Sequence, residues 1–328
     1  MQESAARVVL ITGCSAGGIG HHMALEFATT HGCKVYASAR DTSKISADLL
    51  GKGATPVALD VTSQESVDAA IAFVQRDAGR IDVLVNNAGQ LCISPVVEVD
   101  ICQAQRVFDT NVMGVARVCK AAAPQMMDGR RGTIVNVGSV SGYATTPWVG
   151  YYAASKAALH MLTDAMRMEL APFNVQVVLL APGGITSNLH ANGKATLCEG
   201  TRYGMARDQV DKRAEFSQTG NATPATRFAS VVVPRLLSRN PPAYLTYGNL
   251  SLQMWLLYYM PWWVRDYLTG IHFGMRKMAR EMAASNGGGG ARCPVTNPRA
   301  LLATAVVAVG AVALTYVVPL LYGNSAAG

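Results

Sequence analysis

The amino-terminal part of this chain passes directly from an apolar strand pattern into a glycine-rich turn and then into a helical pattern. The run Arg7–Thr12 is short, apolar and β-branched, which predicts a buried strand. The turn from Gly13 to Gly20 contains four glycines, and glycine lets the backbone bend tightly and approach a ligand closely. The amino terminus of the helix that follows would present free N–H groups and a partial positive charge to a pyrophosphate. This order of elements predicts a dinucleotide-binding unit.

Three further strand patterns follow, separated by stretches long enough for helices. They are Lys34–Ala39, Thr55–Val61, and Ile81–Gly89, which ends in small and amide residues. Strands that alternate with helices predict an α/β fold, a Rossmann-like, doubly wound parallel sheet with helices on both faces. Ligands of such sheets bind beyond the carboxyl ends of the strands, where the loops singled out here lie.

The residue after the second strand indicates which dinucleotide binds. An acidic residue there would bond the ribose 2′-hydroxyl, whereas an arginine accommodates a 2′-phosphate. Arg40 occupies this position, so we expect NADPH rather than NADH; the alternative is a solvated surface charge. Ser15 could add a phosphate contact, and Asp60 could accept a hydrogen bond from the adenine amino group.

Tyr152 and Lys156 lie four residues apart in a helical pattern, which places them on one face. A neighbouring cation favours the phenolate and lowers the pKa of a phenol. We therefore expect Lys156 to bring Tyr152 within reach of acid–base chemistry near neutral pH. The spacing is common, so the pair needs support from other residues.

That support comes from an ordered set of motifs that resembles the short-chain dehydrogenase/reductase family over roughly the first 240 residues. The interval from Ser139 to Tyr152 is 13 residues (152 − 139), as the family pattern requires. One departure is an extra residue in the glycine loop between Thr12 and Gly20. The matching segments are TGCSAGGIG at 12–20, LDVT at 59–62, NNAG at 86–89, Asn111 in NVMG, Ser139 in IVNVGSVSG, YAASK at 152–156 and APGGITS at 181–187.

The resemblance implies a role for each matching residue. Tyr152 would pass its proton to a substrate carbonyl, and Ser139 would bond the same oxygen. Lys156 would lower the tyrosine pKa and hold the nicotinamide ribose, and Asn111 would hold a water that links Lys156 to solvent. The implied cofactor-binding residues are Gly13, Ser15, Gly18, Ile19, Gly20, Arg40, Asp60, Val61, Asn87, Ala88, Gly89, Tyr152, Lys156, Pro182, Gly183, Ile185 and Ser187.

The carboxyl end of the chain has a different composition. No charged residue occurs from Ala300 to Gly328, and about 20 apolar residues suffice to span a bilayer as a helix. We therefore predict four parts: a catalytic domain at 1–245, an aromatic and basic membrane-proximal helical segment at 246–285, a flexible linker at 286–298, and a transmembrane or monolayer anchor at 299–322. A buried core helix is the alternative for the last part. Arg292 and Arg299 precede the uncharged run that begins at Ala300, so the catalytic domain would face the cytosol.

The segment 246–285 holds three of the four tryptophans, followed by Arg276, Lys277 and Arg280. Aromatic and basic residues together suit a membrane interface, although the same segment could form a lid over a substrate pocket. The net charge of +7 would then favour anionic lipid surfaces. No motif for nucleic-acid binding is present, and we expect the endoplasmic reticulum membrane or the surface of a lipid droplet as the location.

The amino terminus lacks the pattern of a signal peptide, because the polar Gln2, Glu3 and Ser4 precede the first strand. Seven cysteines are scattered without CxxC spacing or pairing with histidine. This pattern predicts neither disulfides nor a metal site and fits a reduced cytosolic environment.

Substrate choice in this family resides in the loop after Gly183, here about 184–216. Its basic residues could bind an anionic head group, or they could belong to a solvated helix.

The glycine loop, YASARD and the Trp-rich segment are similar to those of NADPH-dependent 1-acyldihydroxyacetone-phosphate reductases, which make lysophosphatidic acid. The first two segments also resemble hydroxysteroid and retinol dehydrogenases. A lipid-like carbonyl substrate and a possible homo-oligomer are expected in either case, and the alternative of another class is a catalytically silent membrane scaffold. The basic residues of the loop 184–216 are Lys194, Arg202, Arg207, Lys212 and Arg213.

Overall fold

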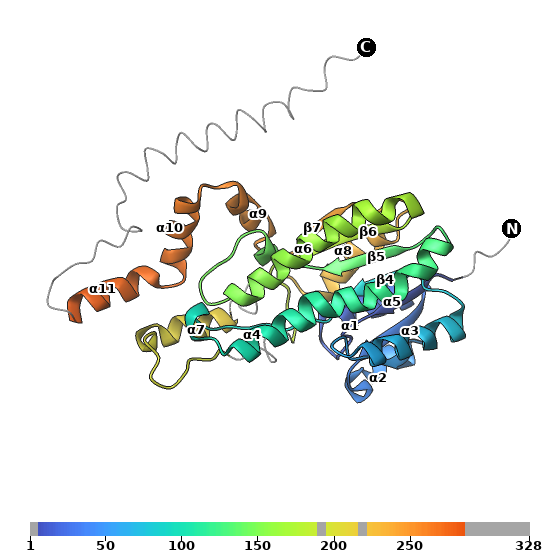
Figure 1. The fold of residues 1–328 in the computed structure, drawn as a ribbon, viewed down its shortest axis with the longest axis horizontal. Coiled ribbons are helices and arrows are strands. Elements are labelled where there is room, and N and C mark those ends of the chain that lie inside the picture. The colour runs from blue at the N-terminus through green and yellow to red at the C-terminus, as the bar shows by residue number, and fades with distance from the viewer. Residues whose placement is uncertain (1–5, 189–194, 216–221, 286–328) are drawn as a thin grey trace, which may run out of the picture.

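A seven-stranded parallel sheet forms the centre of the molecule in a computed structural model that describes residues 6–188, 195–215 and 222–285. The strand order is β3-β2-β1-β4-β5-β6-β7 (Figure 1). The prediction of a doubly wound α/β fold is confirmed. The strands are β1 (Val8–Ile11), β2 (Lys34–Ala39), β3 (Thr55–Ala58), β4 (Val83–Asn86), β5 (Thr133–Val137), β6 (Gln176–Pro182) and β7 (Tyr244–Tyr247).

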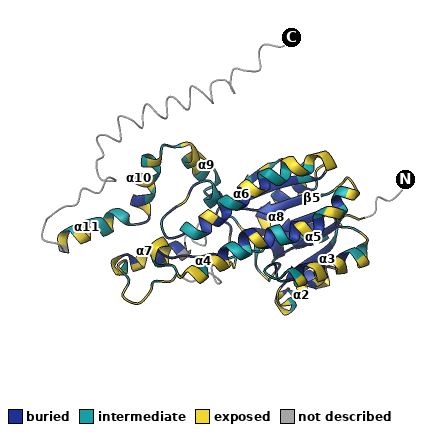
Figure 2. Cartoon of the chain, in the orientation of Figure 1, coloured by how far each residue is buried: buried dark blue, intermediate teal, exposed yellow. Residues whose placement is uncertain are grey.

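Helices cover both faces of the sheet because alternate side chains of each strand point to opposite sides. In β1, Val9 and Ile11 pack into one core cluster, with helices α1 and α8. Val8 and Leu10 pack into the other, with α3, α5 and α6. Figure 2 shows the buried residues along the sheet and on the inner sides of these helices. The helices are α1 (Ile19–Thr29), α3 (Gln64–Ala78), α5 (Gly114–Asp128), α6 (Gly150–Leu170) and α8 (Ala225–Leu236), with the shorter α2 (Ala47–Gly51) and α4 (Ile101–Phe108).

The strand β3 ends at Ala58, earlier than the predicted Val61. The Asp60 carboxylate accepts hydrogen bonds from the Thr62 backbone N–H (2.9 Å) and hydroxyl (2.7 Å). This side-chain turn bends the chain away from the sheet, and it places Asp60 in the loop beyond the strand.

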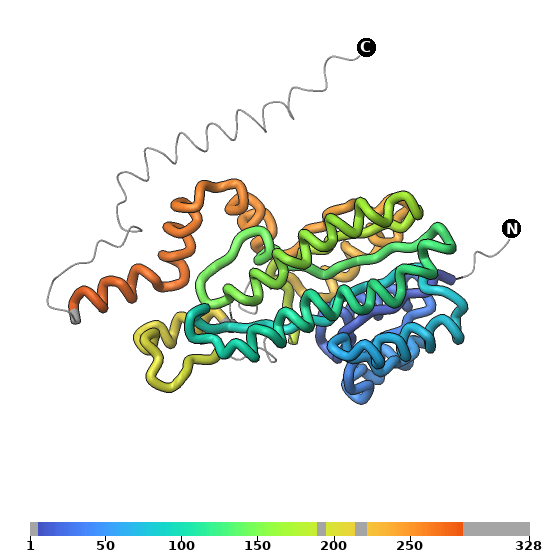
Figure 3. Tube along the Cα trace, in the orientation of Figure 1, coloured from blue at the N-terminus to red at the C-terminus, as the bar shows by residue number. Residues whose placement is uncertain are grey.

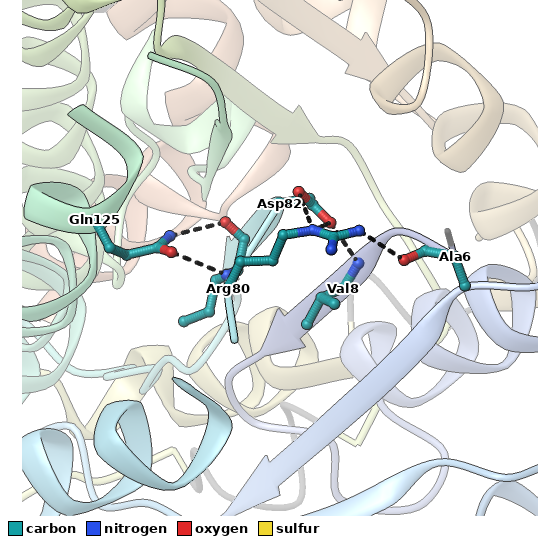
Figure 4. A network of polar contacts seen from close by, with 6 residues as sticks. Ala6, Val8, Arg80, Asp82 and Gln125 are labelled. Carbon is teal, nitrogen blue, oxygen red and sulfur yellow. Dashed lines mark hydrogen bonds and ion pairs between the residues drawn. The ribbon is translucent and has the colours of Figure 1, made fainter. Parts of the chain in front are cut away.

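At the amino ends of the central strands, Asp82 joins the starts of β1 and β4 (Figure 4). Its carboxylate accepts from the backbone N–H of Val8 (2.9 Å) and from Nε of Arg80 (2.9 Å). The Gln125 side chain of α5 donates to the Ile81 carbonyl (2.9 Å). These bonds fix the strand register at the amino ends and leave the carboxyl ends to form the site.

Four helices from the chain beyond β6 form an extension at one end of the molecule, while α8 and β7 belong to the central sheet and its cover (Figure 3). A third cluster of buried residues, which includes Trp148, Tyr152, Val210 and Phe273, joins this extension to α6. None of the helices in the described ranges combines the length and apolar character needed to cross a membrane. The predicted linker and anchor, 286–322, lie outside the described residues. The extension contains α7 (Arg207–Glu215), α9 (Ser251–Tyr259), α10 (Trp262–His272) and α11 (Met275–Ser285).

Candidate active site

One cavity lies at the carboxyl ends of the strands, where a parallel sheet binds its ligands. It is lined by all of the predicted site residues except Gly20 and Asn111. The cavity therefore joins loops that are far apart in sequence, from the glycine loop near residue 13 to the segment around Ser187.

The glycine loop turns tightly into α1 despite its extra residue. The Gly18 N–H donates to the Ser15 carbonyl (3.1 Å), which closes a turn. Gly17 has φ +75°, a conformation that side chains with a Cβ rarely adopt. Gly18 is the N-cap of α1, and the helix has neither a side-chain cap nor an acidic residue in its first turn. An uncapped helix amino terminus at the cavity fits a pyrophosphate group.

Gly20 serves the packing beneath this loop instead of lining the cavity. A Cβ there would lie 2.4 Å from the Asn87 amide nitrogen and 2.7 Å from the Gly13 carbonyl oxygen. The Asn87 amide donates to the carbonyls of Thr12 and Gly13, at 2.9 Å each. Asn87 thus joins the end of β4 to the glycine loop, and only glycine leaves room for it.

Arg40 and Asp60 occupy the end of the cavity beyond β2 and β3. Arg40 is exposed and lines the cavity, as does Asp60. Burial disfavours ionisation of Asp60, but hydrogen bonds from Thr62 and the charges of Arg40 and Arg117 hold the pKa of its carboxyl below the usual value. The residues present therefore offer a cation and a carboxylate where an adenosine would bind.

Ser139, Tyr152 and Lys156 meet at the other end of the cavity. Ser139 follows β5, and its hydroxyl is hydrogen-bonded to the Tyr152 phenol. The Lys156 amine lies 5.9 Å from the centroid of the Tyr152 ring and donates to the Val137 carbonyl (2.8 Å). The helix α6 supplies both the phenol and the amine, so the spacing of four residues does place them side by side.

The expected effect of Lys156 on Tyr152 is wrong for the protein alone. Burial raises the pKa of the Tyr152 phenol, while the bond to Ser139 and the charge of Arg213 act in the opposite direction. The same burial lowers the pKa of Lys156 to about 8. Desolvation disfavours the charged form of both groups, and it is the largest cause of both pKa shifts.

Asn111 lies in a short π-helical turn, Asp109–Met113, between α4 and α5. Such turns insert an extra residue into a helix and occur frequently at functional sites. The Asn111 side chain is fully buried and is held by the backbone of Gln90 (2.7 and 2.9 Å) and by the Ser155 hydroxyl (2.9 Å). Its predicted role of holding a water stays a prediction.

Several functional residues have no signature in the sequence. His160, one turn after Lys156, accepts a hydrogen bond from the Ser139 N–H (3.4 Å), and burial with the charge of Lys156 lowers the pKa of its imidazole to about 4. A neutral imidazole thus supports the Ser139 loop. Thr146 also lines the cavity, and Leu250 and Met254 line it from the Trp-rich segment, which agrees with the lid interpretation.

A parallel Rossmann-like sheet with a nucleotide cavity and a serine–tyrosine–lysine cluster defines a nicotinamide-dependent oxidoreductase. A family model described as short chain dehydrogenase matches residues 7–197, and the chain belongs to that family. The family resemblance noted in the sequence is thereby confirmed, and members of the family use NAD or NADP.

Two curated relatives and one solved structure illustrate the similarity. The short-chain dehydrogenase ptmH of Penicillium ochrochloron is 35% identical over 264 residues, 80% of this chain and 96% of the relative. An NADPH-dependent 1-acyldihydroxyacetone phosphate reductase of Schizosaccharomyces pombe is 39% identical over 196 residues, 60% of this chain and 65% of the relative. A crystal structure of a short-chain dehydrogenase from Streptomyces avermitilis superposes with a TM-score of 0.67 at 28% identity, covering 88% of this chain and 99% of that one.

Proposed function

We propose that the protein is an NADPH-dependent reductase of a lipid-like ketone, and that its substrate is 1-acyldihydroxyacetone phosphate. The observation that carries the proposal is the convergence of Ser139, Tyr152 and Lys156 on one cavity whose other end holds Arg40. The name of the Schizosaccharomyces pombe relative supports the choice of cofactor and substrate. The product would be 1-acylglycerol 3-phosphate, which is lysophosphatidic acid.

Bound NADPH supplies the hydride that the ketone carbon accepts. The Tyr152 phenol donates its proton to the ketone oxygen, so that the C=O bond becomes a secondary alcohol. The Ser139 hydroxyl donates to the same oxygen while negative charge develops on it. Lys156, charged below its pKa of about 8, stabilises the tyrosinate that is left until solvent returns a proton.

The preference for NADPH follows from the charge at the end of β2. Arg40 extends the cavity where the adenine ribose would lie, and its guanidinium matches the geometry of a phosphate. Asp60 lies in the loop after β3 and is engaged by Thr62. The proposal therefore assigns Arg40 to the 2′-phosphate and Asp60 to the adenine.

A substrate panel tests the reaction. We would measure NADPH oxidation in detergent with 1-acyldihydroxyacetone phosphate, retinal and oestrone, and repeat it with NADH. Turnover of the phosphorylated lipid with NADPH, and slower turnover with NADH, is the expected result. Turnover of only retinal or oestrone would overturn the substrate assignment and leave a dehydrogenase of another lipid class.

The proposal also places the protein on a membrane or lipid-droplet surface of the endoplasmic reticulum, with the catalytic domain in the cytosol. No side chain of α9 is buried. Trp255 of α9 is 46% exposed and Trp262 of α10 is 66% exposed. The helix α9 also lines the cavity, through Met254. An apolar chain could therefore pass between the cavity and a lipid phase along α9. The exposed apolar residues of α9 and α10 are Leu252, Trp255, Leu256, Tyr258, Tyr259, Trp262, Leu268 and Ile271.

Tryptophan fluorescence reports contact of α9 and α10 with a lipid surface separately from insertion of the predicted anchor, because 299–322 contains no tryptophan. We would mix the full chain with vesicles of anionic lipids that carry brominated acyl chains, which quench nearby tryptophans. Quenching is expected, and Trp255→Phe with Trp262→Phe should reduce the quenched fraction. The matched control replaces Met161 and Met168, exposed apolar residues of α6, by serine. Vesicle-bound protein with unquenched fluorescence would contradict the contact.

A further inference from the structure

The basic residues of the segment after β6 differ sharply in where the structure places them. Arg202, Arg207 and Lys212 are exposed to solvent, and Lys194 lies outside the described residues. Arg213 is only 8% exposed and lines the same cavity as Tyr152 and Ser139. Solvent exposure on the surface accounts for the first three but not for Arg213.

Arg213 is held by residues from two other parts of the chain. Its Nε donates to the Thr146 hydroxyl (3.3 Å), in the loop between β5 and α6. Its guanidinium carbon lies 5.6 Å from the centroid of the Phe273 ring, in the connection between α10 and α11. Phe273 is itself fixed, because its carbonyl accepts from the Trp148 indole N–H (3.4 Å). Stacking and hydrogen bonding together orient the planar guanidinium.

The charges around the cavity favour an anion at this end. Burial lowers the pKa of Arg213 to about 10, so the guanidinium stays charged at neutral pH. Asp60 is the only carboxylate among the described residues that line the cavity. It follows β3, which is four strand positions from β5, a separation of roughly 19 Å at about 4.8 Å per strand. Asp60 therefore lies far beyond ion-pairing distance of a group bound beside Ser139 and Tyr152.

We propose that Arg213 forms the anion subsite of the substrate, where it binds a phosphate or carboxylate group carried next to the reacting ketone. The proposal deepens the proposed function and rests on it for the chemical class of the substrate. In 1-acyldihydroxyacetone phosphate, one carbon and one oxygen separate the phosphorus from the ketone carbon. A phosphate this close to the ketone must lie beside the carbonyl oxygen to which Tyr152 donates its proton. Steroids and retinal carry no such group.

Paired substrates test the subsite directly. We would measure KM and kcat at saturating NADPH for 1-acyldihydroxyacetone phosphate and for its dephosphorylated counterpart, 1-acyldihydroxyacetone. Arg213→Gln should raise KM for the phosphorylated ketone by about 10- to 100-fold, the range of a charge-assisted hydrogen bond. The KM values for the neutral ketone and for NADPH should stay within about twofold. Arg207→Gln, an exposed arginine of the same helix, is the matched control and should change neither.

The rival role for Arg213 is to tune the Tyr152 phenol. In that case Arg213→Gln would lower kcat equally for both ketones and shift the pH profile, without selective loss of the phosphorylated substrate. This outcome would overturn the anion subsite.

A competition experiment in the wild-type protein keeps the proposal testable if Arg213→Gln fails to fold. Inorganic phosphate should compete with 1-acyldihydroxyacetone, or with retinal, at saturating NADPH, and absence of competition would overturn the subsite. If phosphate competes but the phosphorylated ketone is not reduced, the subsite stands and the proposed substrate is wrong. The two failures are thus distinguishable.

Discussion

Gly20→Ala is a substitution that tests how the nucleotide loop is built. The added Cβ would lie 2.4 Å from the Asn87 amide nitrogen and 2.7 Å from the Gly13 carbonyl oxygen. Either the Asn87 side chain or the glycine loop must move. Movement of Asn87 breaks its two 2.9 Å hydrogen bonds to the carbonyls of Thr12 and Gly13.

The magnitude follows from three contributions. Overpacking at a buried contact costs about 2 kcal/mol, and the two lost hydrogen bonds cost about 1 kcal/mol each. Alanine in place of glycine stabilises a helix by about 1 kcal/mol, which offsets part of this cost. The free energy of unfolding should therefore fall by about 3 kcal/mol, which lowers Tm by roughly 6–12 °C for a domain of this size.

Urea unfolding and thermal melts measure the change, and NADPH binding is measured alongside them. The control is Gly51→Ala in α2, where the added Cβ meets nothing within 4 Å; it should leave stability unchanged or raise it by up to about 1 kcal/mol. The NADPH Kd should rise for Gly20→Ala and stay constant for Gly51→Ala. Equal stability and equal Kd for the two variants would refute the role assigned to Asn87.

Three further predictions concern the chemistry. Tyr152→Phe removes the proton donor and should lower kcat by about 10²- to 10⁴-fold; biological activity that stays unchanged in this variant would favour the scaffold hypothesis. Because Lys156 loses its proton as pH rises through about 8, kcat/KM for reduction should fall above that pH. Lys156→Arg should move this decline to higher pH, and a flat profile from pH 7 to 10 in the wild type would contradict the assignment. Arg40→Leu should raise KM for NADPH by about tenfold and leave KM for NADH unchanged; equal effects on both cofactors would argue against a 2′-phosphate contact.

Much of the fold could be predicted from the sequence because its signals are local. The β1 strand, the glycine turn and α1 are contiguous, and apolar strands alternate with helices, so the parallel sheet follows from short-range pattern alone. The end of β3 could not be predicted in the same way. Val61 continues the apolar pattern, but the hydrogen bonds from Thr62 to Asp60 compete with the sheet and end it.

The site was harder to predict where tertiary packing decides the outcome. The segment 184–216 contains five basic residues that the sequence pattern does not separate. Arg213 is distinguished by its burial and by contacts with Thr146 and Phe273, residues 67 and 60 positions away (213 − 146 and 273 − 213). The pKa of Tyr152 is a similar case, because its spacing from Lys156 shows which groups are neighbours, whereas the extent of their burial depends on distant segments.

The raised pKa of Tyr152 bears on the direction of the reaction. A phenol whose pKa lies above its usual value keeps its proton at neutral pH and is ready to donate it. An alkoxide formed by hydride addition is a far stronger base than a phenolate, so the transfer stays favourable even from a raised pKa. Oxidation of an alcohol would require Tyr152 to begin as the phenolate, which burial disfavours. The resting protonation state of Tyr152 at neutral pH is therefore the one that reduction requires, and the ammonium of Lys156 supplies positive charge for the transient tyrosinate.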